Sequence, residues 1–249
     1  MKKHKLLANF TILLIVIAFF GMRYNSLKER SQLAELAYTN NKDLGIVYLY
    51  ENGLLEPYFV LEDNYLNQGN VLLLRKHLLD VSTNFQKSRG LPDYENSHVD
   101  VYLHEQLPNY FSSDFYQSIP FTTINIVQEF QAVTINRKFF SLAEYEVFPA
   151  KRFRFLANND GSLNFFEKEN TDKGMAYTNG GILGSWWLRS TSIKTIELAH
   201  IVGYDGTKTG GFLQQTMAYI RPAFTLPPET PIKKVVQYGK EMYIIPESR

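Results

Sequence analysis

The chain has 249 residues, and its best candidates for metal chemistry lie around two histidines in its middle third. His104 and Glu105 begin an H-E-x-x-H zinc motif, but Pro108 stands where the second histidine must be and would break the helix that the motif requires. Asp100 and His104 are four residues apart and share one helix face, and His98 is close by in sequence. This pattern favours a solvated helix face over a metal site, so we predict no bound metal.

Carboxylates are the next candidates, because two of them facing one bond can hydrolyse a glycoside. Glu144, Glu146, Glu167 and Glu169 are close in sequence, but their number defines no geometry. The chain has no G-x-S-x-G, P-loop or G-x-G-x-x-G motif. It also has no cysteine, which excludes disulfides, thiol catalysis and thiolate zinc sites. We therefore predict no catalytic residue and no cofactor, and keep a paired-carboxylate envelope hydrolase as an alternative.

Trp186 and Trp187 are the only tryptophans, and they are adjacent. On a strand they point to opposite faces, so one ring can fill the core while the other forms a platform for a sugar or an aromatic ligand. The competing interpretation, which we favour, is that both are buried, because both faces of this strand can be covered.

Arg189 and Arg221 each lie in an otherwise apolar strand and need a carboxylate or carbonyl partner there. We expect structural pairing with Glu144 or Asp205 rather than a ligand contact. If a ligand is bound here, guanidinium groups favour an anionic or hydroxyl-rich one. The predicted ligand-binding residues are therefore Trp187, Arg189 and Arg221.

An apolar segment at the N-terminus predicts where the protein is located. Leu6–Met22 has 17 uncharged residues, which as a helix span roughly 26 Å. Lys5 and Arg23 can snorkel to cover the remaining bilayer thickness. Phe19 disfavours cleavage after Gly21, so we predict an uncleaved signal anchor rather than a cleaved signal peptide or a buried cytosolic helix.

Charge supports the same topology. Residues 1–22 carry three lysines and no acid, whereas the remaining residues carry 23 basic and 25 acidic side chains. The positive-inside rule places the N-terminus in the cytoplasm and the body outside, at the cell surface. A slightly acidic body argues against nucleic-acid binding.

The body divides into predicted segments. Residues 1–23 form the basic start and the anchor, 24–43 a juxtamembrane stalk with leucines at helical spacing, 44–231 the extracytoplasmic domain and 232–249 a C-terminal extension. In the domain, Gly45–Tyr50 and Leu54–Leu61 flank an Asn-Gly pair, which predicts a hairpin.

The middle of the body has helix signals and the last third has strand signals. Helices are expected at Val99–Leu107, at Asp114–Ile119, and after the capping-box pattern of Ser141 and Glu144. Strands are expected at Leu198–Gly203 and Met217–Phe224. We predict an α+β fold with mainly antiparallel sheets and two to three short helices, preceded by a transmembrane helix.

The order of several elements resembles the bacterial domain-of-unknown-function family 6273. Trp186–Ser190 looks like its W-W-L-R-S-P element, with Thr191 in place of proline, and Arg221–Ala223 looks like its R-P-A strand. Further elements of the family look like Phe140–Glu144, Pro57–Leu61 and Ser97–Asp100, and the resemblance covers about residues 45–226.

This resemblance implies a fold similar to C-type-lectin-like domains and the formylglycine-generating enzyme, with a loop-rich ligand face. It implies structural roles for Trp186, Ser141, Glu144 and Pro222. The enzyme branch uses cysteines, which this chain lacks, and the calcium-dependent sugar motifs of lectins are missing. We therefore expect a non-catalytic binding module, anchored in the membrane by Leu6–Met22, for an envelope glycan or protein. The alternative is a scaffold that contacts another membrane protein and binds no small ligand.

Overall fold

A computed structural model describes residues 32–39, 44–87, 91–128, 131–148, 162–166, 171–192, 197–237 and 239–246. The predicted membrane segment Leu6–Met22 lies outside these residues. Within them, no helix has both the length and the apolar character that a membrane span requires.

The first feature of the domain is the predicted hairpin. Strands β1 (Gly45–Glu51) and β2 (Leu54–Glu62) pair antiparallel, from Gly45 opposite Val60 to Glu51 opposite Leu54. Asn52 and Gly53 both have positive φ, 50° and 79°, which a two-residue hairpin turn of this kind requires. The Asn-Gly signal therefore identified this hairpin correctly.

A seven-stranded sheet contains this hairpin, in the order β15-β16-β1-β2-β3-β14-β7. Its pairs are antiparallel except that of β1 with β16. Strands β14 and β3 are neighbours although residues 76–222 separate them in the sequence. The remaining bounds are β3 (Val71–Arg75), β7 (Phe139–Phe140), β14 (Ala223–Leu226), β15 (Lys233–Gln237) and β16 (Lys240–Ile244).

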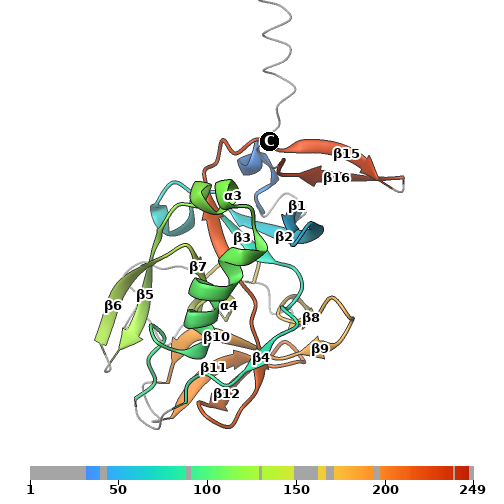
Figure 1. The fold of residues 1–249 in the computed structure, drawn as a ribbon. Helices are drawn as coiled ribbons and strands as arrows, with labels where there is room; N and C mark the ends of the chain where they lie inside the picture. Colours follow the sequence, from blue (N-terminus) through green and yellow to red (C-terminus); the bar gives the residue numbers. More distant parts are fainter. Residues whose placement is uncertain are drawn as a thin grey trace, which may run out of the picture.

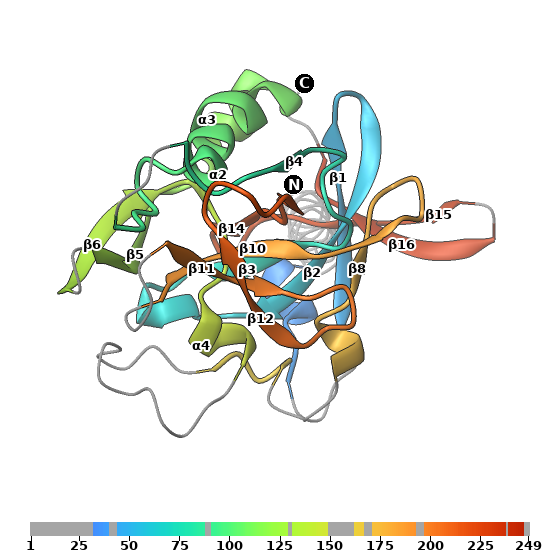
Figure 2. The same ribbon diagram turned by 90° about the horizontal axis from the view of Figure 1, so that it is seen from below.

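A second, five-stranded sheet has the order β12-β11-β10-β13-β4 and lies at the opposite end of the domain (Figure 1). Two smaller pairs, β5 with β6 and β8 with β9, flank the body on different sides (Figure 2). The bounds are β4 (Ser82–Thr83), β5 (Thr122–Gln128), β6 (Gln131–Arg137), β8 (Ala176–Tyr177), β9 (Leu183–Gly184), β10 (Trp186–Thr191), β11 (Leu198–Val202), β12 (Lys208–Phe212) and β13 (Ala218–Tyr219).

The two sheets are joined where two segments cross between them side by side. The chain from β3 to β4 runs against the chain from β13 to β14, and the Leu79 amide donates to the Ile220 carbonyl at 2.9 Å. Met217–Phe224 is therefore not one continuous strand, because Arg221 and Pro222 interrupt it at this crossing. Polar side chains at the crossing lie between the sheets and must find partners there.

The prediction of an α+β fold is wrong, because the described residues are mainly strands and the helical segments are short. The longest α-helix among the described residues, α3 (Ser113–Ser118), has six residues, and Ser112 caps it by accepting from the Phe115 amide. Strands β5 and β6 occupy much of the middle, which we expected to be mainly helical. The other segments are η1 (Leu33–Leu36), η2 (Tyr65–Asn67), α2 (His98–Val101), the π-helical η3 (Tyr102–Gln106), η4 (Leu107–Tyr110), α4 (Glu144–Val147) and η5 (Thr171–Lys173).

The core extends into both predicted flanking segments. Leu33 and Ala37, from the predicted stalk, are buried in the same hydrophobic cluster as β3, all five residues of which are buried. At the other end, β15 and β16 join the seven-stranded sheet from within the predicted C-terminal extension.

Candidate functional site

The structure buries all three residues predicted to bind a ligand. Trp187 and Arg189 have no exposed surface, and Arg221 is 1% exposed. Trp186 is also fully buried, so the interpretation with both tryptophans in the core is confirmed. The indole N–H of Trp186 donates to the Gly174 carbonyl, and that of Trp187 donates to the Thr83 carbonyl. These contacts are structural, and a ligand role for the three residues stays a prediction.

Arg189 is the centre of a sealed ion pair. Both of its terminal nitrogens donate to the Glu146 carboxylate, at 2.7 and 2.9 Å, and neither side chain is exposed. Arg189 also donates to the Ser141 carbonyl, while the Tyr65 hydroxyl donates to Glu146. A buried ion pair is tolerated in the core when other hydrogen bonds satisfy the remaining donors and acceptors of both groups. We call Tyr65, Glu146 and Arg189 the sealed cluster.

Neither predicted arginine pairs with Glu144 or Asp205. Glu144 instead forms ion pairs with His200 and Lys208. Burial opposes ionisation of Glu144, but these two partners outweigh it and lower its pKa to about 2. The Asp205 carboxylate accepts from Thr207 in its own turn. Helix α4 begins at Glu144, later than the capping-box pattern predicts, and Glu146 accepts from the Ala143 amide.

Arg221 is held differently, without a carboxylate among its described contacts. Its Nε donates to the Arg75 carbonyl at 3.0 Å, and its Nη2 to the Lys76 carbonyl at 3.3 Å. Its guanidinium also lies over the rings of Trp186 and Phe59, at 5.0 and 5.7 Å. Burial lowers the pKa of Arg221 to about 9. The neighbouring Pro222 carbonyl accepts from the Arg75 amide, so Arg221 and Pro222 brace the crossing between the sheets.

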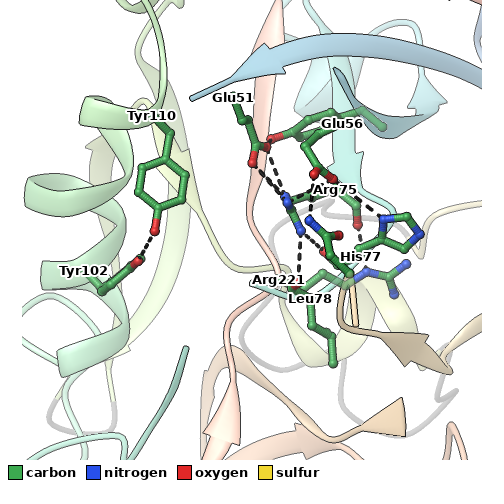
Figure 3. A network of polar contacts seen from close by, with 10 residues as sticks. Glu51, Glu56, Arg75, His77, Leu78, Tyr102, Tyr110 and Arg221 are labelled. Atoms are coloured by element: carbon green, nitrogen blue, oxygen red, sulfur yellow. Dashed lines mark hydrogen bonds and ion pairs between the residues drawn. The ribbon is translucent and has the colours of Figure 1, made fainter. Parts of the chain in front are cut away.

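A second group of charged residues, missed by the sequence predictions, lies at the same crossing (Figure 3). Arg75, at the end of β3, donates to both oxygens of Glu51 and forms an ion pair with Glu56 at 3.0 Å. Its Nη1 donates to the carbonyls of His77 and Leu78. All guanidinium nitrogens of Arg75 are thus satisfied, and two carboxylates from the β1–β2 hairpin share one cation.

This group reaches the surface, unlike the sealed cluster. The Asn179 amide, in the β8–β9 turn, donates to Glu56 Oε1 at 2.6 Å. His77 Nδ1 lies 3.7 Å from Glu56 Oε2, and the His77 side chain is 32% exposed. Burial lowers the pKa of His77, so its ring is neutral at neutral pH. Its Nδ1 is buried, which leaves Nε2 as the ring nitrogen that can face a ligand. We call Glu51, Glu56, Arg75 and His77 the open cluster.

Two tyrosines stand across from the open cluster (Figure 3). The hydroxyls of Tyr102 and Tyr110 are 2.6 Å apart and hydrogen-bonded to each other. Burial and the bond to Tyr110 raise the pKa of Tyr102 well above its ordinary value, so its hydroxyl stays protonated. Tyr102 begins the π-helical turn η3, a geometry that is frequent at functional sites.

Exposed apolar side chains occur on the two hairpins that contribute to or contact the open cluster, β1–β2 and β8–β9. The Leu78 amide donates to the Tyr177 carbonyl, which holds the β8–β9 hairpin against the crossing. Tyr177 is 45% exposed, and Leu54 and Ile182 are more exposed still. Leu54 is two residues before Glu56 on the same face of β2. We call the resulting surface the hairpin face; it consists of Leu54, His77, Tyr177, Asn179 and Ile182.

The described carboxylates around these clusters give little support to acid–base chemistry. A basic side chain forms an ion pair with each of Glu51, Glu56, Glu144 and Glu146. Asp100 likewise accepts two hydrogen bonds from the Arg137 guanidinium. Glu167 and Glu169 lie outside the described residues. No group of three or more metal-ligating side chains occurs in the described part of the chain.

The sequence carried one signal that could have revealed the open cluster. Arg75 ends the apolar run of β3, in the same way that Arg189 and Arg221 interrupt apolar strands. The rule that such an arginine needs partners applies equally to it. Its carboxylates could not be identified in advance, because they come from β1 and β2 and the pairing of β2 with β3 was not predicted.

Fold and site together define a mostly β domain, in whose described part buried arginine clusters lie between the seven-stranded and the five-stranded sheet. The family described as Domain of unknown function (DUF6273) matches residues 68–228, so the chain belongs to this family. The match contains Arg75, His77, Asn179, Arg189 and Arg221, whereas Glu51 and Glu56 precede it. No curated protein matches the chain. No solved structure matches it either, so the expected likeness to C-type-lectin-like domains is not confirmed.

Proposed function

We propose that this protein is a non-catalytic binding module of the cell envelope, and that its ligand surface is the hairpin face. The observation that carries the proposal is the Glu56 carboxylate, which Arg75 and Asn179 hold in place beside the half-exposed His77. Donors and acceptors that are already held in place before binding lose little conformational entropy when a ligand binds. The envelope location follows from the sequence prediction for Leu6–Met22.

The chemistry of this surface favours a glycan over a protein. Neutral imidazole, amide and carboxylate groups match hydroxyl groups, and the exposed Tyr177 ring offers an apolar plane beside them. A sugar ring needs both features at once, with hydroxyls at its rim and C–H groups on its face. Binding here requires no calcium, in keeping with the missing calcium-dependent lectin motifs.

Sedimentation of the full chain with purified peptidoglycan sacculi, in mild detergent, tests this proposal. We expect Tyr177→Ala and His77→Ala to weaken sacculus binding about fivefold to thirtyfold, because each removes a contact worth about 1–2 kcal/mol. The matched control is Phe121→Ala, since Phe121 is also exposed but precedes β5 on the far side of the body (Figure 1). Equal co-sedimentation of all variants with the parent chain would contradict the proposal.

The alternative is a scaffold that contacts a membrane protein and binds no glycan. The exposed Leu54 and Ile182 favour it, because apolar side chains beside polar groups are also typical of protein interfaces. In that case Leu54→Asp and Ile182→Asp abolish crosslinking to a partner in membranes, while sacculus binding is absent from the parent chain as well.

A further inference from the structure

The hairpin formed by β15 and β16 extends beyond the sheet that it joins. β16 pairs with β1 at only two positions, Val47 with Tyr243 and Tyr48 with Ile244, although β16 has five residues. β15 pairs with β16 alone and forms the edge of the sheet. In both ribbon views the hairpin projects sideways from the body as an arm (Figures 1 and 2).

Most of this arm is left uncovered by the described parts of the protein, and only Tyr243, opposite Val47 of β1, packs against the core. Every residue of β15 and β16 is exposed or half-buried, and Val236 is 70% exposed. A two-stranded ribbon without a covered face is only marginally stable in water. The arm therefore has the character of a docking element.

The two faces of the arm differ in charge. On one face, Lys234 and Glu241 form an ion pair at 2.6 Å and neutralise each other. The opposite face has lysines and no acid, with apolar groups between them. Because Lys233 is opposite Ile244, Val235 is opposite Met242 and Gln237 is opposite Lys240, these residues share that face. We call it the basic face; its charge is +2.

Lysines on an edge strand oppose pairing with a second copy of the same edge. A second copy would bring Lys233 and Lys234 of both chains close together, which like-charge repulsion disfavours. Charge complementarity points instead to an anionic surface. The apolar Val235 and Met242 between the lysines suit an interface that accepts both charge and hydrocarbon.

The base of the arm is tied to the first described residues of the chain. Gln32 forms a β-bridge with Pro231, and the Leu33 amide donates to the Thr230 carbonyl at 3.0 Å. Nine residues separate Gln32 from the end of the apolar segment Leu6–Met22, and they reach at most about 30 Å. An arm that begins at Lys233 is therefore on the side of the domain that faces the bilayer.

We propose that the β15–β16 arm lies on an anionic lipid bilayer, with its basic face in the headgroup region. This inference rests on the envelope location in the proposed function, but not on the glycan. Lys233 and Lys240 contact lipid phosphates, and Val235 and Met242 enter the interface. The arm thereby fixes the orientation of the domain and keeps the hairpin face directed away from the bilayer.

The absence of cysteine makes a sharp test available. Single-cysteine variants Val235→Cys and Val236→Cys, in the full chain, place one environment-sensitive fluorophore on opposite faces of the same strand. The chains are reconstituted into vesicles of phosphatidylcholine, or of phosphatidylcholine and phosphatidylglycerol in equal parts. Headgroup-level nitroxide lipids then quench any label that lies in the interface.

We expect strong quenching of the label at position 235 in the anionic vesicles, with at least about twofold less quenching at 236 and in neutral vesicles. Lys233→Gln and Lys240→Gln should each weaken the anionic-lipid effect about fivefold. The matched control Lys234→Gln/Glu241→Gln removes one charge of each sign from the other face and should leave the effect unchanged.

Two results would overturn the inference. One is a label at 235 that stays water-exposed in anionic vesicles. The other is equal protection of this label by a soluble anionic polymer without lipid, which would identify a polymer rather than a bilayer as the partner. Sacculus co-sedimentation of the lysine variants separates this inference from the proposed function. The lysine variants should still co-sediment with sacculi, because they lose only the contact between the arm and the lipid.

Discussion

The sealed cluster and the open cluster both stabilise a buried arginine with carboxylates, but they differ in how the carboxylates are arranged. Each places an arginine with at most 3% exposure against carboxylates from other elements. Arg189 and Glu146 form a closed pair with Tyr65, whereas Arg75 is shared by two carboxylates, one of which also contacts the surface residue Asn179. A closed pair fixes the core, while the shared cation leaves Glu56, which is 8% exposed, in contact with the surface side chain of Asn179. The difference therefore separates a structural role from a recognition role.

The largest effect should come from opening the sealed cluster. Arg189→Met leaves the fully buried Glu146 without its cation, which should lower the free energy of unfolding by about 3–5 kcal/mol. Urea titration followed by tryptophan fluorescence measures this loss. The double variant Arg189→Met/Glu146→Leu should recover much of the stability. Failure of the double variant to recover would mean that the pair is not the main source of the loss.

Arg75→Met should cost somewhat less, about 3 kcal/mol: Glu51 and Glu56 both lose their cation, but they are 4% and 8% exposed, whereas Glu146 is 0% exposed. The Tyr58 hydroxyl still donates to Glu51, and the Asn179 amide still donates to Glu56. The same variant should also lose sacculus binding, whereas a binding defect is not expected for an Arg189 variant that remains folded. Unfolding curves and co-sedimentation of the two variants are compared side by side. A stable Arg75→Met protein with normal binding would contradict the recognition role of the open cluster.

Gly211→Ala is predicted to destabilise the five-stranded sheet by about 1–3 kcal/mol through overpacking. A Cβ at this position would lie 2.4 Å from Ile201 Cδ1 and 2.6 Å from the Trp187 ring, and both of these side chains are buried. Gly210→Ala is the matched control, because its Cβ would meet only Leu198 at an ordinary 3.7 Å. Thermal unfolding distinguishes the two variants; equal melting temperatures would show that the Trp187 ring can move aside.

The smallest effect concerns Glu62, a neighbour of the sealed cluster. Burial, followed by repulsion from Glu146 and Asp63, raises the pKa of Glu62 from 4.5 to about 7. The folded protein holds this proton up to about pH 7, whereas the unfolded chain releases it near pH 4.5, so the contribution of Glu62 to stability falls as pH rises between these values. Glu62→Gln should flatten this decline in urea titrations from pH 4 to pH 8. An unchanged pH profile would place Glu62 in water.

Local patterns predicted local structure well. The hairpin at Asn52 and Gly53 and the Ser112-capped helix α3 both depend on neighbours within a few residues. The strand at Leu198–Gly203 was expected for the same reason and is present as β11. In contrast, the helix start predicted from the capping-box pattern at Ser141 is wrong. Ser141 is fully buried, and its carbonyl accepts a hydrogen bond from Arg189.

Long-range pairing could not be read from one sequence. Arg189 was expected to bind Glu144 or Asp205 and binds Glu146, two residues from the first candidate and on a different face of the same short helix. The open cluster combines β1, β2 and β3, which are neighbours in one sheet, and Asn179 of the β8–β9 turn contacts it from 123 residues beyond Glu56 in the sequence.

By itself, the sequence determined the charge asymmetry, the absence of thiol chemistry, the turn and cap positions and the family to which the chain belongs. These depend on composition or on residues near one another in the chain. The tertiary structure alone decided which arginines are sealed, which carboxylates they bind and which polar groups reach the surface. Burial and charge pairing are properties of elements brought together from distant parts of the chain, so only their packing sets them.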